Sequence, residues 1–157
     1  MITTNGADIF LMYITRESIV SGTIKDTSGN LNTTNIGATT FNFTQIYTGG
    51  VAGMSLHFGS GDTAESVDDY CLAADFGIYP TVSSCGKDDA SWVITASSRN
   101  STGASITINE IGVIACTGLG STHQEFLIAR KVVPERVVEN GETFTYTYAI
   151  DIAQLGG

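Results

Sequence analysis

Apolar and polar residues alternate along most of this chain, which is the pattern of β-strands that bury one face. The alternation is strictest near the C-terminus, where apolar side chains occupy every second position between threonines and other small or polar residues: Phe144, Tyr146, Tyr148, Ile150 and Ile152. Trp92, Ile94 and Ala96 share one face of an earlier segment in the same way. The pattern predicts strands over 39–47, 52–58, 91–100, 104–115, 125–133 and 143–152.

Two short turn sequences separate neighbouring strands and predict hairpins. Residues 100–103 read Asn-Ser-Thr-Gly, and residues 139–142 read Glu-Asn-Gly-Glu before the last strand. Asn-Gly between apolar runs is a strong hairpin signal, because a type I′ turn needs positive φ at both central residues. We therefore expect the strands on either side of each turn to be hydrogen-bonded neighbours.

The first 40 residues differ from the rest of the chain. A short helix is predicted within residues 6–19, with Asn5 available as its cap, because the apolar positions fall near helical spacing: Ile9, Phe10, Tyr13 and Ile14. Residues 21–40 are small, polar and turn-prone, as in a surface loop or an irregular hairpin. We expect residues 1–40 to form an arm that is loose in the free protein and orders when it docks on a partner.

Six or more short strands, little helix and no alternation of strands with helices predict an all-β fold. The expected architecture is an antiparallel β-sandwich or a jelly-roll-like fold, with a short N-terminal helix as an addition. The 157 residues suffice for one such domain, which we place at residues 41–157 after the arm.

The charge balance excludes some partners. Seven Lys and Arg against 16 Asp and Glu give a formal charge of −9, so nucleic acid and anionic membranes are not expected partners. The N-terminus lacks the pattern of a secretory signal, and the apolar stretch 9–14 is too short to span a bilayer. Three widely spaced cysteines, Cys71, Cys85 and Cys116, are expected to be reduced and mostly buried.

Residues 59–70 interrupt the strands with glycines and acidic side chains. We expect a loop that runs into a turn of helix and is held to the body by Tyr70 and Leu72. Four carboxylates in this stretch are a weak candidate calcium site, but they lack the spacing of a dedicated calcium loop, and a solvated loop is favoured: Asp62, Glu65, Asp68 and Asp69.

No catalytic constellation is visible in the sequence. The only histidines are His57 and His123, no Gly-x-Ser-x-Gly elbow surrounds Ser60, and the cysteines lack zinc-site spacing. We therefore expect no enzymatic activity and no cofactor. A His or Cys within hydrogen-bonding distance of a carboxylate inside a pocket would argue for the opposite hypothesis.

Three basic residues, Arg130, Lys131 and Arg136, lie close together in an otherwise acidic chain. They are a candidate interface with an acidic neighbour of the same protein, because contacts between copies favour unlike charges. Solvated basic residues that keep a strand soluble are an equally good interpretation.

The C-terminal half contains a recognisable series of short motifs. Residues 106–113 read ITINEIGV, residues 126–130 read FLIAR, and residues 137–150 read VVENGETFTYTYAI. Upstream, residues 58–64 read FGSGDTA and residues 69–72 read DYCL. In order and spacing this series resembles a group of small virion proteins of tailed bacteriophages. The resemblance implies a structural, non-enzymatic role in head decoration, neck or tail, and it covers about residues 56–152.

The same motifs carry a physical prediction. Glu110 lies between Ile108 and Ile111 on a predicted central strand, where an unpaired charge would be costly to bury, and Arg130 on a following strand is its natural partner. We predict a structural Glu110–Arg130 pair, because no nucleophile accompanies it. Gly112 indicates a bulge or a close approach of another segment.

These observations favour a virion structural subunit, made in the host cytoplasm, that binds copies of itself and other virion proteins. Its candidate docking residues are Ile9, Phe10 and Tyr13 on the arm, together with the three basic residues. The alternative is a carbohydrate-binding or receptor-binding sandwich module, for which four aromatic residues are candidates: Tyr47, Tyr70, Tyr79 and Trp92.

Overall fold

The computed structural model describes residues 1–15, 17–20, 22–32, 35–37, 52–78, 80, 82–88, 91–117 and 123–151. Within these residues, helix α1 (Thr4–Thr15) precedes six strands, which are β1 (Gly53–Gly59), β2 (Val82–Asp88), β3 (Ser91–Arg99), β4 (Ile106–Cys116), β5 (Glu125–Val138) and β6 (Thr143–Asp151). The predicted strand 39–47 lies outside the described residues. No helix in the described part of the chain is both long enough and apolar enough to cross a bilayer.

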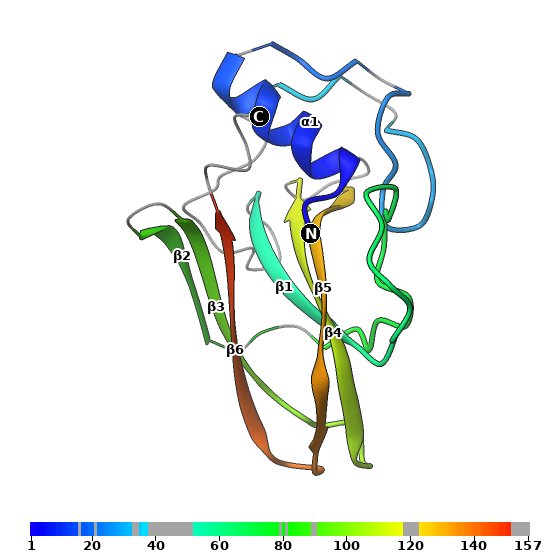
Figure 1. The fold of residues 1–157 in the computed structure, drawn as a ribbon, viewed down its shortest axis with the longest axis vertical. Coiled ribbons are helices and arrows are strands. Elements are labelled where there is room, and N and C mark those ends of the chain that lie inside the picture. The colour runs from blue at the N-terminus through cyan, green and yellow to red at the C-terminus, as the bar shows by residue number, and fades with distance from the viewer. Residues whose placement is uncertain are drawn as a thin grey trace.

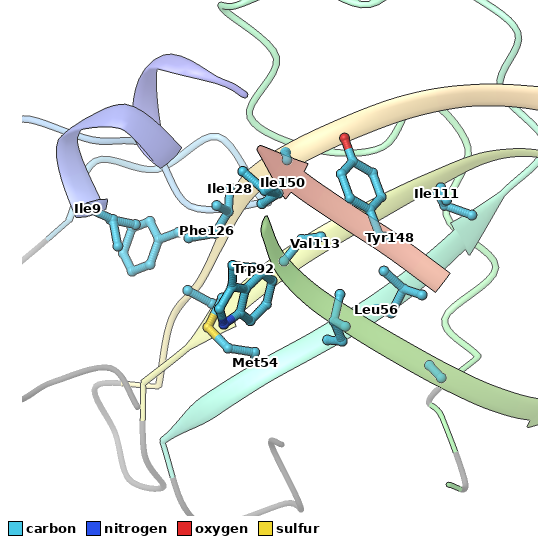
Figure 2. Close-up of a cluster of buried hydrophobic side chains, with 14 of the residues drawn as sticks. Ile9, Met54, Leu56, Trp92, Ile111, Val113, Phe126, Ile128, Tyr148 and Ile150 are labelled. Atoms are coloured by element: carbon cyan, nitrogen blue, oxygen red, sulfur yellow. The ribbon is translucent and has the colours of Figure 1, made fainter. Parts of the chain in front are cut away.

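The strands form two antiparallel sheets of three strands each, in the orders β1-β4-β5 and β2-β3-β6 (Figure 1). The all-β, sandwich-like class predicted from the sequence is confirmed. Side chains from both sheets meet between the layers, where Leu56 and Val113 face Trp92 and Tyr148 (Figure 2). The predicted inward positions Trp92, Ile94 and Ala96 are all buried.

Both predicted hairpins are wrong, because each turn joins the two sheets instead of two neighbouring strands. β3 pairs with β6 along its whole length, whereas β4 pairs with β1 and β5. The turn 139–142 does form, with φ of +87° at Gly141 and a hydrogen bond from the Glu142 amide to the Glu139 carbonyl. Local turn chemistry is compatible with an arch between sheets as well as with a hairpin, so it does not choose the partner strand.

Asn100 ties the two inter-sheet turns together. Its backbone exchanges hydrogen bonds with the second turn, from Asn100 N to the Glu142 carbonyl and from Gly141 N to the Asn100 carbonyl. Its fully buried side chain donates to the carbonyls of Ala104 and Val138 at 2.8 and 2.9 Å. One asparagine therefore holds both arches at the same end of the sandwich.

The N-terminal residues belong to the body of the fold and do not form a loose arm. In α1, Ile9, Phe10 and Met12 are buried in the same core as both sheets. The helix cap is Thr3, whose Oγ1 accepts a hydrogen bond from Gly6 N at 3.1 Å. The expected cap, Asn5, instead donates to the Lys25 carbonyl at 2.6 Å. The expected domain boundary at residue 40 lies outside the described residues.

The described residues between 19 and 36 form an irregular hairpin, one of the two forms expected for this part of the chain. Isolated bridges pair Ile19 with Ile36 and Lys25 with Leu31. Ile24 is buried in the core, and the side chain of Asn32 accepts hydrogen bonds from the amides of Thr23 and Ile24. One bridge therefore holds the hairpin near its two ends, and the other holds it near its tip.

The edge of β5 that does not pair with β4 is covered along most of its length by other parts of the chain. Ile2 bridges Ala129, and the Arg130 amide donates to the Met1 carbonyl. The next outward-facing amide, Val132 N, donates to Glu65 Oε1 at 2.8 Å. The following outward position is Pro134, which has no amide proton. β5 continues through this proline to Val138, beyond the predicted strand end at residue 133.

β2 has no counterpart among the predicted strands. Its sequence, VSSCGKD, lacks a run of large apolar residues, and the strand is held by seven register pairs with β3. Pairing with a neighbour therefore supplies the structure that the local sequence does not indicate.

Candidate functional site

A buried ion pair between β4 and β5 lies on the outward face of sheet β1-β4-β5 and accepts or donates many hydrogen bonds. Glu110 Oε2 accepts a hydrogen bond from Arg130 Nε at 2.7 Å, and the two side chains are 0% and 2% exposed. The pair that the sequence predicts is present. Ile108 and Ile111 are three positions apart on β4, yet both point into the core, so the strand changes face between them. The β4–β5 pairing shifts register at the same place, between Ile108 and Glu110.

The Glu110 carboxylate also accepts three backbone amides from the segment between β1 and β2. Gly61 N and Ala74 N donate to Oε1 at 3.1 and 2.8 Å, and Ala73 N donates to Oε2 at 3.1 Å. We call residues 60–78 the connecting loop. Gly61 lies near the start of this loop and Ala73 and Ala74 lie near its end. Because all three bind the same carboxylate, Glu110 closes the loop onto the sheet.

Arg130 binds the middle of the same loop. Its Nη1 forms a salt bridge with Asp69 Oδ2 at 2.9 Å, and its Nη2 donates to the Thr63 carbonyl at 3.0 Å. Burial alone would lower the pKa of Arg130, but its hydrogen bonds and charge interactions with Glu110 and Asp69 outweigh this effect and raise that pKa. The guanidinium is therefore held charged between two carboxylates.

Three glycines make room for this arrangement. A β-carbon on Gly59 would lie 2.5 Å from both the Ala74 carbonyl oxygen and Glu110 Oε1, and one on Gly61 would lie 2.5 Å from the same Oε1. A β-carbon on Gly112 would meet Leu72 Cδ2 at 2.7 Å, so the close approach considered for this residue is present. At Gly59 and Gly61 no side chain fits without moving the loop or the carboxylate, whereas at Gly112 the side chains of Leu72 and Leu127 would have to shift.

The connecting loop has further anchors on β1 and on the outward face of the sheet. His57 Nδ1 and Asp75 Oδ2 lie 2.8 Å apart, and Phe76 N donates to the Phe58 carbonyl. Leu72 packs in a small separate apolar cluster with Ile114, Cys116 and Leu127. The expected anchor Leu72 is thus buried, whereas Tyr70 is 36% exposed. The expected turn of helix does not form between residues 59 and 78.

The acidic side chains of the loop serve different partners. Asp69 binds Arg130, and Glu65 accepts the Val132 amide, while Asp62 and Asp68 are exposed to solvent. Among the described residues, no group of three or more His, Cys, Asp or Glu is placed to hold a metal ion. The weak calcium-site hypothesis for these four residues therefore has no support in their geometry.

The remaining candidate interface residues are distributed differently from expectation. Arg130 is buried, and Ile9 and Phe10 belong to the core, so none of the three can form a docking surface. Lys131 is exposed, and Arg136 forms a salt bridge with Glu142 at 3.2 Å in which both side chains are about two-fifths exposed (40% and 39%). The side chain of Tyr13 lies outside the described residues.

Two histidines lie within hydrogen-bonding distance of carboxylates. His57 contacts Asp75 at 2.8 Å, and His123 Nε2 lies 3.4 Å from Glu125 Oε1. Neither histidine lines the surface hollows of about 240 to 310 Å³ formed by residues 1–2 with β6, by α1 with residues 17–23, and by the two inter-sheet turns. The His57–Asp75 contact joins β1 to the connecting loop, so its evident effect is to hold the loop in place.

All three cysteines are free thiols, although only Cys116 is buried. Burial raises the pKa of Cys71 and Cys85, and the negative charges of Asp69 and Glu110 raise that of Cys71 further. Burial likewise raises the pKa of Cys116. Thiols with raised pKa values are poor nucleophiles.

The aromatic residues do not form a shared platform in the described part of the chain. Trp92 is in the core, and Lys25 Nζ lies 5.3 Å from the centre of the Tyr70 ring. Tyr47 and Tyr79 lie outside the described residues. The carbohydrate-binding alternative therefore loses Trp92, which is the largest of its four candidates.

Several members of the site escape sequence reasoning. Asp69 stands in an acidic stretch that suggests solvent or a metal ion, and only its place in the DYCL motif hints at a specific role. The amides of Ala73 and Ala74 carry no sequence signal.

Comparison of the chain with protein-family models, with curated proteins and with solved structures gave no significant match.

Proposed function

We propose that this chain is a non-enzymatic structural protein of a tailed-bacteriophage virion, which works by self-association and by docking on other virion proteins. The observation that supports the proposal most is the convergence of the motif residues on one network. Both glycines of FGSGDTA lie against Glu110 of EIG, Glu110 binds the Arg of FLIAR, and this Arg binds the Asp of DYCL. The Leu of DYCL packs against the Gly of EIG on the same face of the sheet. Motifs that are weak singly thus describe one three-dimensional unit.

The network suits a structural role better than a chemical one. Glu110 is engaged by Arg130 and three amides, and Arg130 by two carboxylates and loop carbonyls, so neither charge is available to a substrate without dismantling the loop. A buried, fully hydrogen-bonded network rigidifies what it holds. The connecting loop is therefore a fixed feature of the surface.

The fixed loop also presents contact groups. Val67 is 52% exposed and Tyr70 is 36% exposed, the exposed Asp68 lies between them in the sequence, and the exposed Asp62 lies earlier in the same loop. A rigid loop that mixes apolar and acidic side chains loses little conformational entropy on binding, which is an advantage for a subunit that makes permanent contacts.

The test is to look for the chain in intact particles. Phage particles whose genome encodes this chain are purified on a density gradient, and peptides covering β4 and β6 are quantified by mass spectrometry against the major capsid protein. The proposal predicts co-migration with DNA-filled particles at a fixed number of copies per particle. Recovery of the chain only in the soluble lysate, away from the particles, would contradict it.

A further inference from the structure

The outward face of sheet β2-β3-β6 has an unusual composition. In Figure 1 these strands form one layer, and their other face turns toward β1-β4-β5. We define the hydroxyl face as the outward-facing residues of β3 and β6: Ser91, Val93, Thr95, Ser97, Arg99, Thr143, Thr145, Thr147, Ala149 and Asp151. We propose that two copies of this chain pack through this face, about a two-fold axis that runs along the Thr95–Thr147 pair.

The centre of the hydroxyl face can lose water at low cost. Thr95 Oγ1 and Thr147 Oγ1 are hydrogen-bonded at 2.9 Å, and Ser97 Oγ and Thr145 Oγ1 at 2.7 Å. Hydroxyls that already have a partner within the sheet leave fewer unsatisfied groups when a second surface covers them. Val93 and Ala149, which pair across the strands, add apolar surface.

The side chains of this face are also inexpensive to immobilise. Thr145, Thr147 and Ala149 are exposed, and none of them has the long, flexible chain of Lys or Glu. Short side chains lose little rotamer freedom on burial. Between Arg99 at one end and Asp151 at the other, the described residues of the face carry no charge.

The two charged ends determine how copies can stack. Arg99 pairs with Thr143 at one end of the β3–β6 ladder, and Asp151 pairs with Ser91 at the other. With eight residue steps between them, the ends are about 27 Å apart. A two-fold axis across the strands places Arg99 of each copy over the Ser91–Asp151 end of the other. An axis along the strands would instead place like charges together, so the antiparallel arrangement is favoured.

The size of the face predicts how strong this contact is. A patch two strands wide and about 27 Å long buries on the order of 500 Å² in total, well below the 1,200 to 2,000 Å² of stable complexes. The contact is therefore weak between isolated chains and gains strength when other contacts hold the copies together. The inference rests on the proposed function only in that a self-associating subunit needs such a contact.

Crosslinking of the purified full chain tests the geometry directly. Cys71 and Cys85 are first replaced by serine, and Thr147→Cys is compared with Thr143→Cys using a short bis-maleimide. Both threonines are exposed on the same face of β6. Thr147 lies on the proposed axis and meets its own copy, whereas the two copies of Thr143 lie at opposite ends. We expect at least about tenfold more dimer from Thr147→Cys than from Thr143→Cys.

A charge reversal provides the second measurement. Arg99→Asp in the Thr147→Cys background should lower the dimer yield about fivefold at low salt, and adding Asp151→Arg should restore it. Equal yields from the two cysteines, or no dimer from Thr147→Cys, would overturn the proposed surface. If light scattering still shows oligomers in that case, the copies meet elsewhere and the proposed function stands.

Discussion

A β-carbon on Gly61 would lie 2.5 Å from Glu110 Oε1, and this closeness makes the glycine a direct probe of the ion-pair network. We predict that Gly61→Ala lowers the free energy of unfolding by about 2 to 3 kcal/mol, because the loop must withdraw and its hydrogen bonds to Glu110 are lost. Gly86→Ala is the matched control, since a β-carbon on Gly86 meets no atom within 4 Å. Urea unfolding that shows equal effects for both variants would contradict this role of Gly61.

Removing one partner of the ion pair should be worse than removing both. Arg130→Ala leaves Glu110 and Asp69 without their cation, and we expect it to lower the free energy of unfolding by about 3 to 5 kcal/mol. The double variant Glu110→Leu with Arg130→Met should be milder by about 1 to 2 kcal/mol, because the fully buried Glu110 charge is removed together with its partner and only the partly exposed Asp69 loses its cation. Denaturant unfolding of both variants measures the difference.

The double variant also has a local signature. Because its connecting loop is no longer closed onto the sheet, limited proteolysis should cut within residues 62–70 faster than in the unmodified chain. Equal loss of stability in the single and double variants, with no change in cleavage of the loop, would show that the pair does not hold the loop.

Stability should fall in acid, in part through Asp75. Burial alone would raise the pKa of Asp75, but the hydrogen bond and charge of His57 and the Gly77 amide outweigh it and hold that pKa below its usual value of 3.8. A carboxylate with a lowered pKa in the folded state stabilises the fold above pH 3.8 and loses this effect as the pH falls through the folded-state pKa.

The matched variant for this prediction is Asp75→Asn. It should be less stable than the unmodified chain by about 0.5 to 1 kcal/mol at pH 6. The two proteins should converge below the folded-state pKa of Asp75, which thermal unfolding between pH 6 and pH 2.5 can follow. A constant difference across this range would mean that the ionised Asp75 carboxylate is not the source of the effect.

Truncation at two nearby positions of α1 should have very different effects on stability. Ile9 is 0% exposed in the core, so Ile9→Ala should lower the free energy of unfolding by about 2 to 4 kcal/mol. Leu11 is 58% exposed, and Leu11→Ala should change it by less than about 0.5 kcal/mol. Both changes keep a good helix former, and circular dichroism during chemical unfolding compares them. Equal, small effects would restore the expectation of a loose N-terminal arm.

The sequence predicts which face of a strand is buried better than it predicts which strands pair with each other. Alternation correctly places Trp92 and Ile94 in the core, because burial of one face is a local property of a strand. The choice of neighbour depends on the pairing of distant strands, so the Asn140-Gly141 turn is recognisable while its hairpin is wrong. The N-terminal helix is likewise predicted, but its packing against β5 is not visible in its own residues.

The candidate site follows the same division. Glu110 and Arg130 can be paired from sequence because a buried charge requires an opposite charge, and both residues stand among apolar neighbours. Asp69 cannot be found in this way, since it lies in a polar stretch where a carboxylate needs no partner. Backbone amides, which supply three of the hydrogen bonds to Glu110, are the same for every residue type and leave no trace in the sequence.

The occupied edge of β5 has a consequence for how this protein can aggregate. An open strand edge is a template on which a strand of another molecule can add, and repeated addition produces fibres. Here the backbone of Met1 covers Arg130, the Glu65 carboxylate covers the Val132 amide, and Pro134 offers no amide proton. Growth of fibres by strand addition is therefore blocked along this side of sheet β1-β4-β5.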